Sequence, residues 1–186
     1  MTKWKTLTTQ YLEKNNWIAL RKESCITQTG KKIDEYYVME IQDVSCVIAI
    51  TKEKEEQNKK EKKVVLVKEY KHGVQHEILQ LPCGYIDKGE EPFAAAKREL
   101  QEETGYTSKK WTPLGKFAGS PGRLTHYYHF FLAEECEKTS EPKLDELETL
   151  SVFEYSWKDA EEQLKKQNTD LVTPLGLALA KKVLEN

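Results

Sequence analysis

The sequence predicts a mixed α/β fold, and two kinds of pattern support this prediction. Runs rich in β-branched residues, such as VSCVIAI at 44–50 and KVVLVKEY at 63–70, are typical of strands. After them comes a helical segment framed by Pro92 and Gly105, which suit the first turn and the C′ position of a helix. Strands arranged around one central helix indicate a layered α/β protein.

The N-terminal part is expected to form an antiparallel β-hairpin. Residues 17–28 and 33–42 have the pattern of two strands, and the turn TGKK that joins them contains glycine. The charged stretch TKEKEEQNKKEK, at 51–62, follows the strand at 44–50. Because it mixes lysines with glutamates, we expect a solvated hairpin loop between the strands at 44–50 and 63–70; the alternative is a nucleic-acid patch.

The remaining elements follow from the same kinds of pattern. EILQLP before the helix, WTPLGKFAGS and THYYHFFLAEE after it, and LSVFEYS further along are expected to be strands. Ser156 suits the N-cap of a helix over roughly 157–167. Thr173, followed by Pro174, suits the start of a last helix that ends near Leu184.

Composition argues against several classes of protein. The 186 residues carry a net charge of −2, so no excess of one sign indicates binding to nucleic acid or to an anionic membrane. No apolar run approaches the roughly 18 residues of a membrane span, and the first residues lack the apolar core of a signal peptide. The four cysteines show no CxxC spacing. We therefore expect a cytoplasmic protein with reduced, structural thiols.

Three glutamates, Glu99, Glu102 and Glu103, share one face of the central helix near its C-terminal end. Like charges three and four residues apart repel one another, and the helix dipole adds a further penalty. Grouped carboxylates are the ligands that Mg²⁺ or Mn²⁺ prefers, so a divalent cation would relieve the repulsion. The triplet alone is also consistent with a solvated acidic helix.

The spacing of the whole segment from Gly84 to Tyr106 resembles the Nudix box, GX5EX7REUXEEXGU, where U is a bulky apolar residue. Only Tyr106, at the last position, is slightly unusual. The chain is thus similar to the Nudix hydrolases. This resemblance implies an α/β/α sandwich with a mixed sheet, made of an N-terminal hairpin extension over residues 1–43 and a hydrolase domain over residues 44–186.

The resemblance also implies a metal site. By position in the box, Glu99 and Glu103 would bind Mg²⁺, for which Mn²⁺ would substitute, and Glu102 would hold an additional ion. The backbone carbonyl of Cys83 would complete the shell. Arg98 would orient the glutamates through charged hydrogen bonds. Cations held in this way promote the hydrolysis of a pyrophosphate bond.

Features outside the box resemble the Nudix group that cleaves ADP-ribose. That group characteristically carries proline at the position of Pro121, and EYKHGVQHEILQLPCG looks like its QYR…WELPAG run. Lys71 stands where an arginine usually contacts phosphate, and Gln80 replaces a usual acid. An aromatic residue would stack on adenine, and Arg123 would contact phosphate or ribose. The residues expected at the substrate are Lys71, Pro121, Arg123, Trp17 and Tyr70; the two aromatic residues are also consistent with packing, and Arg123 with a solvated loop.

A general base is implied as well. In the same Nudix group it tends to be a glutamate in a loop after the sheet strands, which corresponds here to EPKLDELETL at 141–150. Glu146 is the first candidate and Glu148 the second, and either is equally consistent with a solvated loop. His126 and His129, in a strand with aromatic residues, are expected to be structural.

The predicted function is Mg²⁺-dependent hydrolysis of ADP-ribose or a related nucleoside diphosphate sugar, giving a nucleoside monophosphate and a sugar phosphate. One alternative is a Nudix pyrophosphatase for a dinucleoside polyphosphate, NADH, a damaged nucleotide or an RNA 5′ end. Another is a module that binds ADP-ribose without cutting it, against which the intact glutamates argue. We expect a homodimer formed through the N-terminal hairpin, with a small-molecule substrate and no membrane partner.

Overall fold

The computed structural model describes residues 3–56, 59–144 and 149–185. The chain forms two compact units: the first comprises Met1–Asp43 with Phe117–Tyr128, and the second comprises Val44–Lys116 with His129–Asn186. Among the described residues, no helix is both long enough and apolar enough to cross a membrane.

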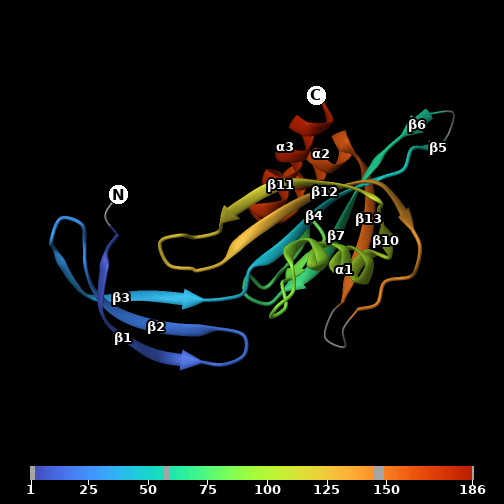
Figure 1. Cartoon of the computed structure of the whole chain (residues 1–186). Helices are drawn as coiled ribbons and strands as arrows, with labels where there is room; N and C mark the ends of the chain where they lie inside the picture. The colour runs from blue at the N-terminus through green and yellow to red at the C-terminus, as the bar shows by residue number, and fades with distance from the viewer. Residues whose placement is uncertain (1–2, 57–58, 145–148, 186) are drawn as a thin grey trace. The chain divides into compact units, whose positions relative to one another are not determined.

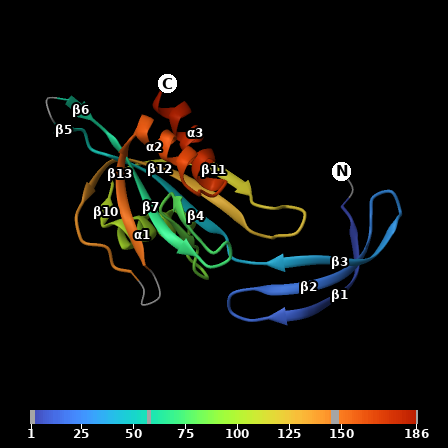
Figure 2. The ribbon, with the colours of Figure 1, turned by 180° about the vertical axis from the view of Figure 1, so that it is seen from behind.

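The first unit contains an antiparallel sheet of three strands, β1 (Lys5–Lys14), β2 (Ala19–Ile26) and β3 (Lys32–Glu40), in that order (Figure 2). Strands β2 and β3 confirm the predicted hairpin. Strand β1 was not predicted, because all ten of its residues are exposed and its sequence shows no alternation of buried and exposed positions.

The second unit is built on a larger sheet with the strand order β10-β12-β4-β7-β13; in addition, β11 pairs with β12, β8 with β7 and β9 with β4 (Figure 1). Strand β4 is almost wholly buried, and so is the apolar run at 64–67 of β7, as their sequences predict. The strands of this sheet are β4 (Val44–Thr51), β7 (Lys63–Lys71), β8 (His76–Gln80), β9 (Cys83–Tyr85), β10 (Tyr106–Thr107), β11 (Lys110–Ala118), β12 (Tyr127–Lys138) and β13 (Leu150–Ser156).

The charged stretch at 51–62 differs from its prediction. It contains the short strands β5 (Lys54–Glu56) and β6 (Lys59–Glu61), which pair with each other in an antiparallel ribbon. The predicted hairpin connection between β4 and β7 is confirmed, but the two short strands within it were not predicted. The stretch lacks the hydrophobic alternation from which strands are recognised, because this ribbon pairs outside the main sheet.

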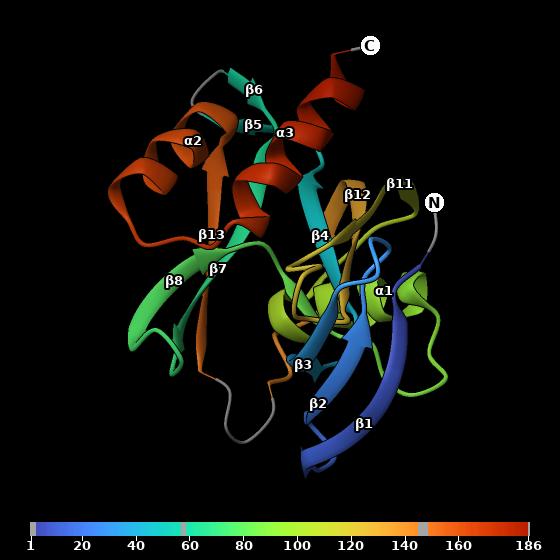
Figure 3. The same ribbon diagram turned by 90° about the vertical axis from the view of Figure 1, so that its left-hand side faces the viewer.

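The second unit has α/β/α layers. The helix α1 (Pro92–Thr104) packs Ala96 and Leu100 into a core with Val47 and Ala49 of β4. Ile48, between Val47 and Ala49 in β4, points to the other face of the sheet. There it lies next to Gly176 of the last helix, α3 (Val172–Leu184). Figure 3 shows α2 (Trp157–Lys166) beside α3, and an ion pair between Lys181 and Glu161 at 3.0 Å joins the two helices. The predicted sandwich is confirmed.

The two C-terminal helices begin differently. Ser156 caps α2 as predicted, since its hydroxyl accepts a hydrogen bond from the N–H of Asp159 at 3.1 Å. The predicted last helix is confirmed: it ends at Leu184 as expected and begins one residue before Thr173. The helix begins at Val172, and the Asp170 carboxylate accepts the Thr173 N–H at 2.8 Å. The Thr173 hydroxyl is buried and instead accepts the N–H of Leu81 at 3.0 Å.

Candidate active site

Helix α1 presents its three acidic side chains in two different environments. The helix ends at Gly105, whose φ of 74° is easily adopted by glycine, so the predicted frame from Pro92 to Gly105 is confirmed. Glu103 is buried with the apolar face, at 5% exposure. The side chains of Glu99 and Glu102 are 13% and 46% exposed. Two of the three carboxylates therefore face inward and the third faces solvent.

The two inward carboxylates meet the same short segment of backbone, Cys83–Gly84. Glu103 Oε2 accepts a hydrogen bond from the Cys83 N–H at 3.0 Å. The Glu99 carboxylate lies so close to Gly84 that a Cβ added there would overlap with it. Antiparallel pairing of β9 with β4 fixes this segment in the sheet. The structure thus brings together Cys83, Glu99 and Glu103, three of the four predicted metal ligands.

Arg98 links the acidic residues to one another. Its Nη1 donates to Glu99 Oε1 at 2.7 Å and to Glu102 Oε2 at 3.1 Å. Its Nε and Nη2 donate to the two oxygens of Glu90 at 3.0 and 2.9 Å, and Nη2 also donates to the carbonyl of Tyr85 at 3.1 Å. The bidentate bond to Arg98 lowers the pKa of Glu90. One guanidinium therefore orients three carboxylates.

Glu103 is strongly perturbed by its surroundings. Burial raises its pKa well above the ordinary value, and negative charge at Cys83 and Glu99 raises it further; the hydrogen bond from the Cys83 N–H and the charge of Lys71 act in the opposite direction. A divalent cation beside this carboxylate would favour its ionised form. The donor set of carboxylates and a backbone carbonyl therefore suits Mg²⁺.

The carboxylates of Glu99 and Glu103 and the carbonyl of Cys83 would hold the ion, and Glu102 would hold an additional one. When bound, Mg²⁺ would supply an acidified water and neutralise phosphate oxygens. Within the described ranges, no three His, Cys, Asp or Glu side chains are grouped closely enough to form a metal site. Two of the carboxylates, Glu99 and Glu102, are instead paired with Arg98, and Glu103 with the Cys83 N–H.

Lys71 lies near the acidic cluster, and its partner Glu69 was not singled out from the sequence. Lys71 Nζ pairs with Glu69 Oε2 at 2.5 Å. Burial lowers the pKa of Lys71, but the hydrogen bond and charge of Glu69, with further attraction from Cys83 and Glu103, outweigh burial and raise it. Positions 69 and 71 of a strand share one face, and this alternation is the signal that would have identified Glu69.

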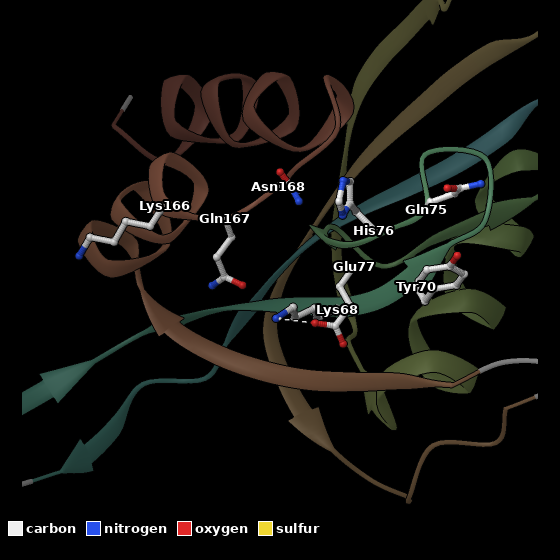
Figure 4. Close-up of a pocket in the computed structure, with 8 residues that line it drawn as sticks. All are labelled: Lys68, Tyr70, Gln75, His76, Glu77, Lys166, Gln167 and Asn168. Carbon is white, nitrogen blue, oxygen red and sulfur yellow. Dashed lines mark ion pairs between the residues drawn. The ribbon is translucent and has the colours of Figure 1, made fainter.

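Tyr70 lies on the opposite face of β7 and is half exposed. There it lines a cavity of about 490 Å³ between the β7–β8 hairpin and the end of α2 (Figure 4). Lys68 and Glu77, which also line this cavity, form an ion pair at 3.0 Å. The glutamates of α1 are not among its lining residues: Lys68, Tyr70, Gln75, His76, Glu77, Lys166, Gln167 and Asn168. The structure therefore does not group Tyr70 with the acidic cluster.

Three other residues predicted at the substrate belong to the first unit: Trp17, Pro121 and Arg123. Trp17 is 74% exposed. The Arg123 guanidinium lies 4.3 Å from the centre of the Tyr36 ring and donates to the Tyr37 carbonyl at 3.1 Å. Arg123 is thus held against β3 rather than free in solvent. The predicted bases Glu146 and Glu148 lie outside the described residues.

Comparison with known proteins decides the family. Residues 42–174 match the NUDIX domain, and residues 4–39 match the nucleoside diphosphate sugar hydrolase N-terminal domain. The chain belongs to the Nudix family. The Nudix match includes the whole acidic site, from Lys71 to Glu103, and the second match coincides with the three-stranded sheet of the first unit.

The curated proteins that resemble this Nudix protein include two from Bacillus species. The chain is 44% identical over 101 residues to the ADP-ribose pyrophosphatase of Bacillus subtilis (strain 168), covering 54% of this chain and 55% of that protein. It is 34% identical over 123 residues to the methanol dehydrogenase activator of Bacillus methanolicus, covering 66% and 62%. The matches thus span less than two thirds of either relative.

The solved structure is described as an ADP compounds hydrolase. It superposes with a TM-score of 0.81 at 20% sequence identity, and the match covers 100% of this chain and 96% of that one. At this identity the likeness concerns the fold. It confirms the predicted Nudix-type architecture with its N-terminal antiparallel extension.

Proposed function

We propose that this Nudix protein catalyses the Mg²⁺-dependent hydrolysis of the pyrophosphate bond in ADP-ribose or a related nucleoside diphosphate sugar, releasing a nucleoside monophosphate and a sugar phosphate. The observation that carries the proposal is the convergence of Glu99 and Glu103 on the backbone of Cys83 and Gly84. The N-terminal match and the similarity to an ADP-ribose pyrophosphatase support this class of substrate.

The roles of the charged residues follow from their contacts. Arg98 positions Glu99 and Glu102, so it acts through the metal ligands rather than on the substrate. Lys71 keeps its positive charge close to Glu103, where it would attract a phosphate oxygen. We assign the general base, which takes a proton from the attacking water, to Glu146 or, failing that, to Glu148.

The remaining substrate contacts are proposals of the same kind. We keep Pro121, Arg123, Trp17 and Tyr70 as residues that contact the nucleoside or the sugar. Arg123 supports this because its guanidinium is already ordered by Tyr36 and Tyr37. Trp17 supports it because it is 74% exposed, so its ring is open to a base. For Tyr70, which faces away from Lys71 and Glu69, the proposal rests on the family resemblance alone.

We also propose that the protein is a cytoplasmic homodimer. The N-terminal segment leaves large apolar side chains in solvent, as is typical of association surfaces. These residues are Trp4, Leu7, Tyr11, Leu12, Trp17 and Ile18. All four cysteines are free thiols, which suits a reducing compartment. Light scattering of the purified protein would test the dimer, and a monomer at micromolar concentration would contradict it.

The decisive experiment is a hydrolysis assay. Purified protein is incubated with ADP-ribose and Mg²⁺, and AMP is followed by chromatography, with a parallel sample in EDTA. We expect AMP and ribose phosphate to form only with the metal. A panel containing GDP-mannose, NADH and a dinucleoside polyphosphate would rank competing substrates. Stoichiometric binding of ADP-ribose without any product would instead favour the binding module.

A further inference from the structure

Two cysteines face each other across the strands that support the acidic site. Cys46 of β4 and Cys83 of β9 are direct partners in an antiparallel pairing that also joins Ser45 with Gly84. Directly opposed residues in such a pairing point to the same face of the sheet. Interaction with Cys46, together with burial, raises the pKa of the Cys83 thiol well above its ordinary value. The two side chains are therefore neighbours on one face of the sheet.

The backbone hydrogen bonds show which kind of pair this is. The Val47 N–H donates to the Pro82 carbonyl at 2.9 Å, so Val47 and Pro82 form a hydrogen-bonded pair. Pair types alternate along an antiparallel ladder, which makes Cys46 and Cys83 a non-hydrogen-bonded pair, with Cα atoms about 4.5 Å apart. Disulfides span Cα separations of roughly 4.4–6.8 Å. A covalent bond is thus compatible with the present backbone.

Exposure gives the two thiols different roles. Cys46 is wholly buried, whereas Cys83 is partly exposed. The other two cysteines, Cys25 and Cys136, are buried, and Cys136 donates to the Ala133 carbonyl at 3.3 Å. An oxidant would therefore react first at Cys83, and Cys46 is the thiol placed to complete the bond.

We propose that Cys46 and Cys83 form a reversible disulfide when the protein meets a low-molecular-weight disulfide. Cys83 sulfur attacks one sulfur of the reagent and expels the first small thiol, which leaves a mixed disulfide. Cys46 sulfur then attacks Cys83 sulfur and expels the second small thiol. In total, two protein thiols are oxidised, the reagent is reduced to two thiols, and the two thiol protons pass to these leaving groups.

The new bond would act on the acidic site through the backbone. β9 is only three residues long, and Cys83 in this strand donates its N–H to Glu103 while the neighbouring Gly84 supports Glu99. Most disulfides have Cα separations of roughly 5.5–6 Å, longer than that of this pair, so closing the bond shifts β9 relative to β4. This part of the inference rests on the proposed function. Displacing groups that orient metal ligands typically lowers activity by about tenfold or more, and we expect such a loss.

The test treats the full chain with glutathione disulfide and analyses its peptides by mass spectrometry without reduction. We expect one cross-linked species containing Cys46 and Cys83, lighter by two hydrogen atoms, which dithiothreitol reverses. Cys46→Ala should give only glutathione attached to Cys83. Cys136→Ala, the matched control for another buried thiol, should keep the cross-link. A folded wild-type protein that carries only glutathione on Cys83, or no modification, would overturn the proposal.

Activity is measured separately on the same samples. We expect oxidised wild type to hydrolyse ADP-ribose about tenfold more slowly than reduced wild type, with recovery in dithiothreitol and the same loss for oxidised Cys136→Ala. A disulfide without any change in rate would overturn the coupling to the site. If the reduced protein hydrolyses no nucleotide while the cross-link forms, the proposed function fails and the modification site stands.

Discussion

The carboxylate of Glu103 on α1 accepts a hydrogen bond at 3.0 Å from the backbone N–H of Cys83 on β9, twenty residues earlier in the chain. This bond ties the end of the acidic helix to the strand that precedes the box. Since Glu103 is also buried and close to Glu99, its negative charge is opposed from several sides. Changes to any of these groups should therefore alter both the activity and the stability of the protein.

Glu103→Gln should abolish hydrolysis and leave the fold intact. The amide is nearly isosteric, and its oxygen can still accept the Cys83 N–H, but it contributes no charge to bind a divalent cation. We expect kcat/KM to fall by at least about 100-fold in an ADP-ribose assay. Glu162→Gln is a matched control, because Glu162 pairs with Lys166 on exposed α2 at 3.5 Å. A wild-type rate for Glu103→Gln would show that Glu103 is not a ligand.

The metal-free protein should lose stability as pH rises, through Glu103. Burial raises the pKa of this carboxyl above its ordinary value of 4.5, so between the two values the folded state holds a proton that the unfolded state has released. Stability from this group is complete below pH 4.5 and is lost as pH rises through the folded pKa.

Urea unfolding in EDTA, followed from acid to neutral pH for wild type and Glu103→Gln, measures this effect. Other carboxyls, such as Glu90 with its lowered pKa, contribute in the opposite direction in both proteins. The difference between the two unfolding free energies therefore isolates Glu103. As pH rises, the free energy of unfolding of Glu103→Gln should increase relative to that of wild type. Parallel curves for the two proteins would contradict the assignment.

Much of the second unit follows from local sequence, because its elements satisfy local rules. Pro92 and Gly105 frame α1 through their own backbone preferences, and the apolar runs of β4 and β7 are buried on both faces. Strand β1 could not be predicted from local sequence, because it has no buried face and therefore no apolar pattern. Its position depends on hydrogen bonds to β2, which leave no periodic trace in the sequence.

The acidic site divides in the same way. Helical periodicity places Glu99, Glu102 and Glu103 on one face, and the resemblance to the Nudix box assigns them to a metal. The partnership of Lys71 with Glu69 and the face-to-face position of Cys46 and Cys83 arise from strand alternation and register. These relationships need the paired sheet, because nothing in the spacing from 46 to 83 specifies which strands are neighbours.

Arg98→Lys should impair hydrolysis without unfolding the protein. An ammonium cannot reproduce the planar fork that binds Glu90 twice and reaches Glu99 and Glu102. We expect a loss of roughly 10- to 100-fold, partly recovered at high Mg²⁺ because the carboxylates are misplaced rather than removed. Arg21→Lys, where Arg21 pairs with Glu40 at 2.7 Å in the first unit, is the control. Equal rates at every Mg²⁺ concentration would remove Arg98 from this role.

Glu146→Gln should slow the chemical step and leave metal affinity unchanged, because a general base acts on water and not on the cation. Removing such a base typically costs about 10²- to 10⁴-fold in rate. Pre-steady-state AMP formation and Mn²⁺ titration separate the two quantities. Glu141→Gln is a suitable control, since exposed Glu141 pairs with Lys138 at 3.0 Å. Unchanged kinetics for Glu146→Gln, with slowed kinetics for Glu148→Gln, would move the base to Glu148.

Gly84→Ala should inactivate the protein by displacing one carboxylate. A Cβ at Gly84 would occupy the position of the Glu99 carboxylate, and the side chain of Glu99 is flexible enough to move away. The free energy of unfolding should therefore change by no more than about 1 kcal/mol. Hydrolysis should fall about 100-fold, because a ligand displaced by an ångström no longer meets the reacting groups correctly.

Gly73→Ala is the matched control, since no atom of the described residues lies within 4 Å of a Cβ at that position. It should keep both stability and rate. Mn²⁺ affinity, measured by electron paramagnetic resonance, should weaken for Gly84→Ala and stay unchanged for Gly73→Ala. Full activity and metal affinity for Gly84→Ala would show that the contact between Gly84 and Glu99 has no role in catalysis. The contacts of Glu99 and Glu103 with β9 would then only stabilise the fold.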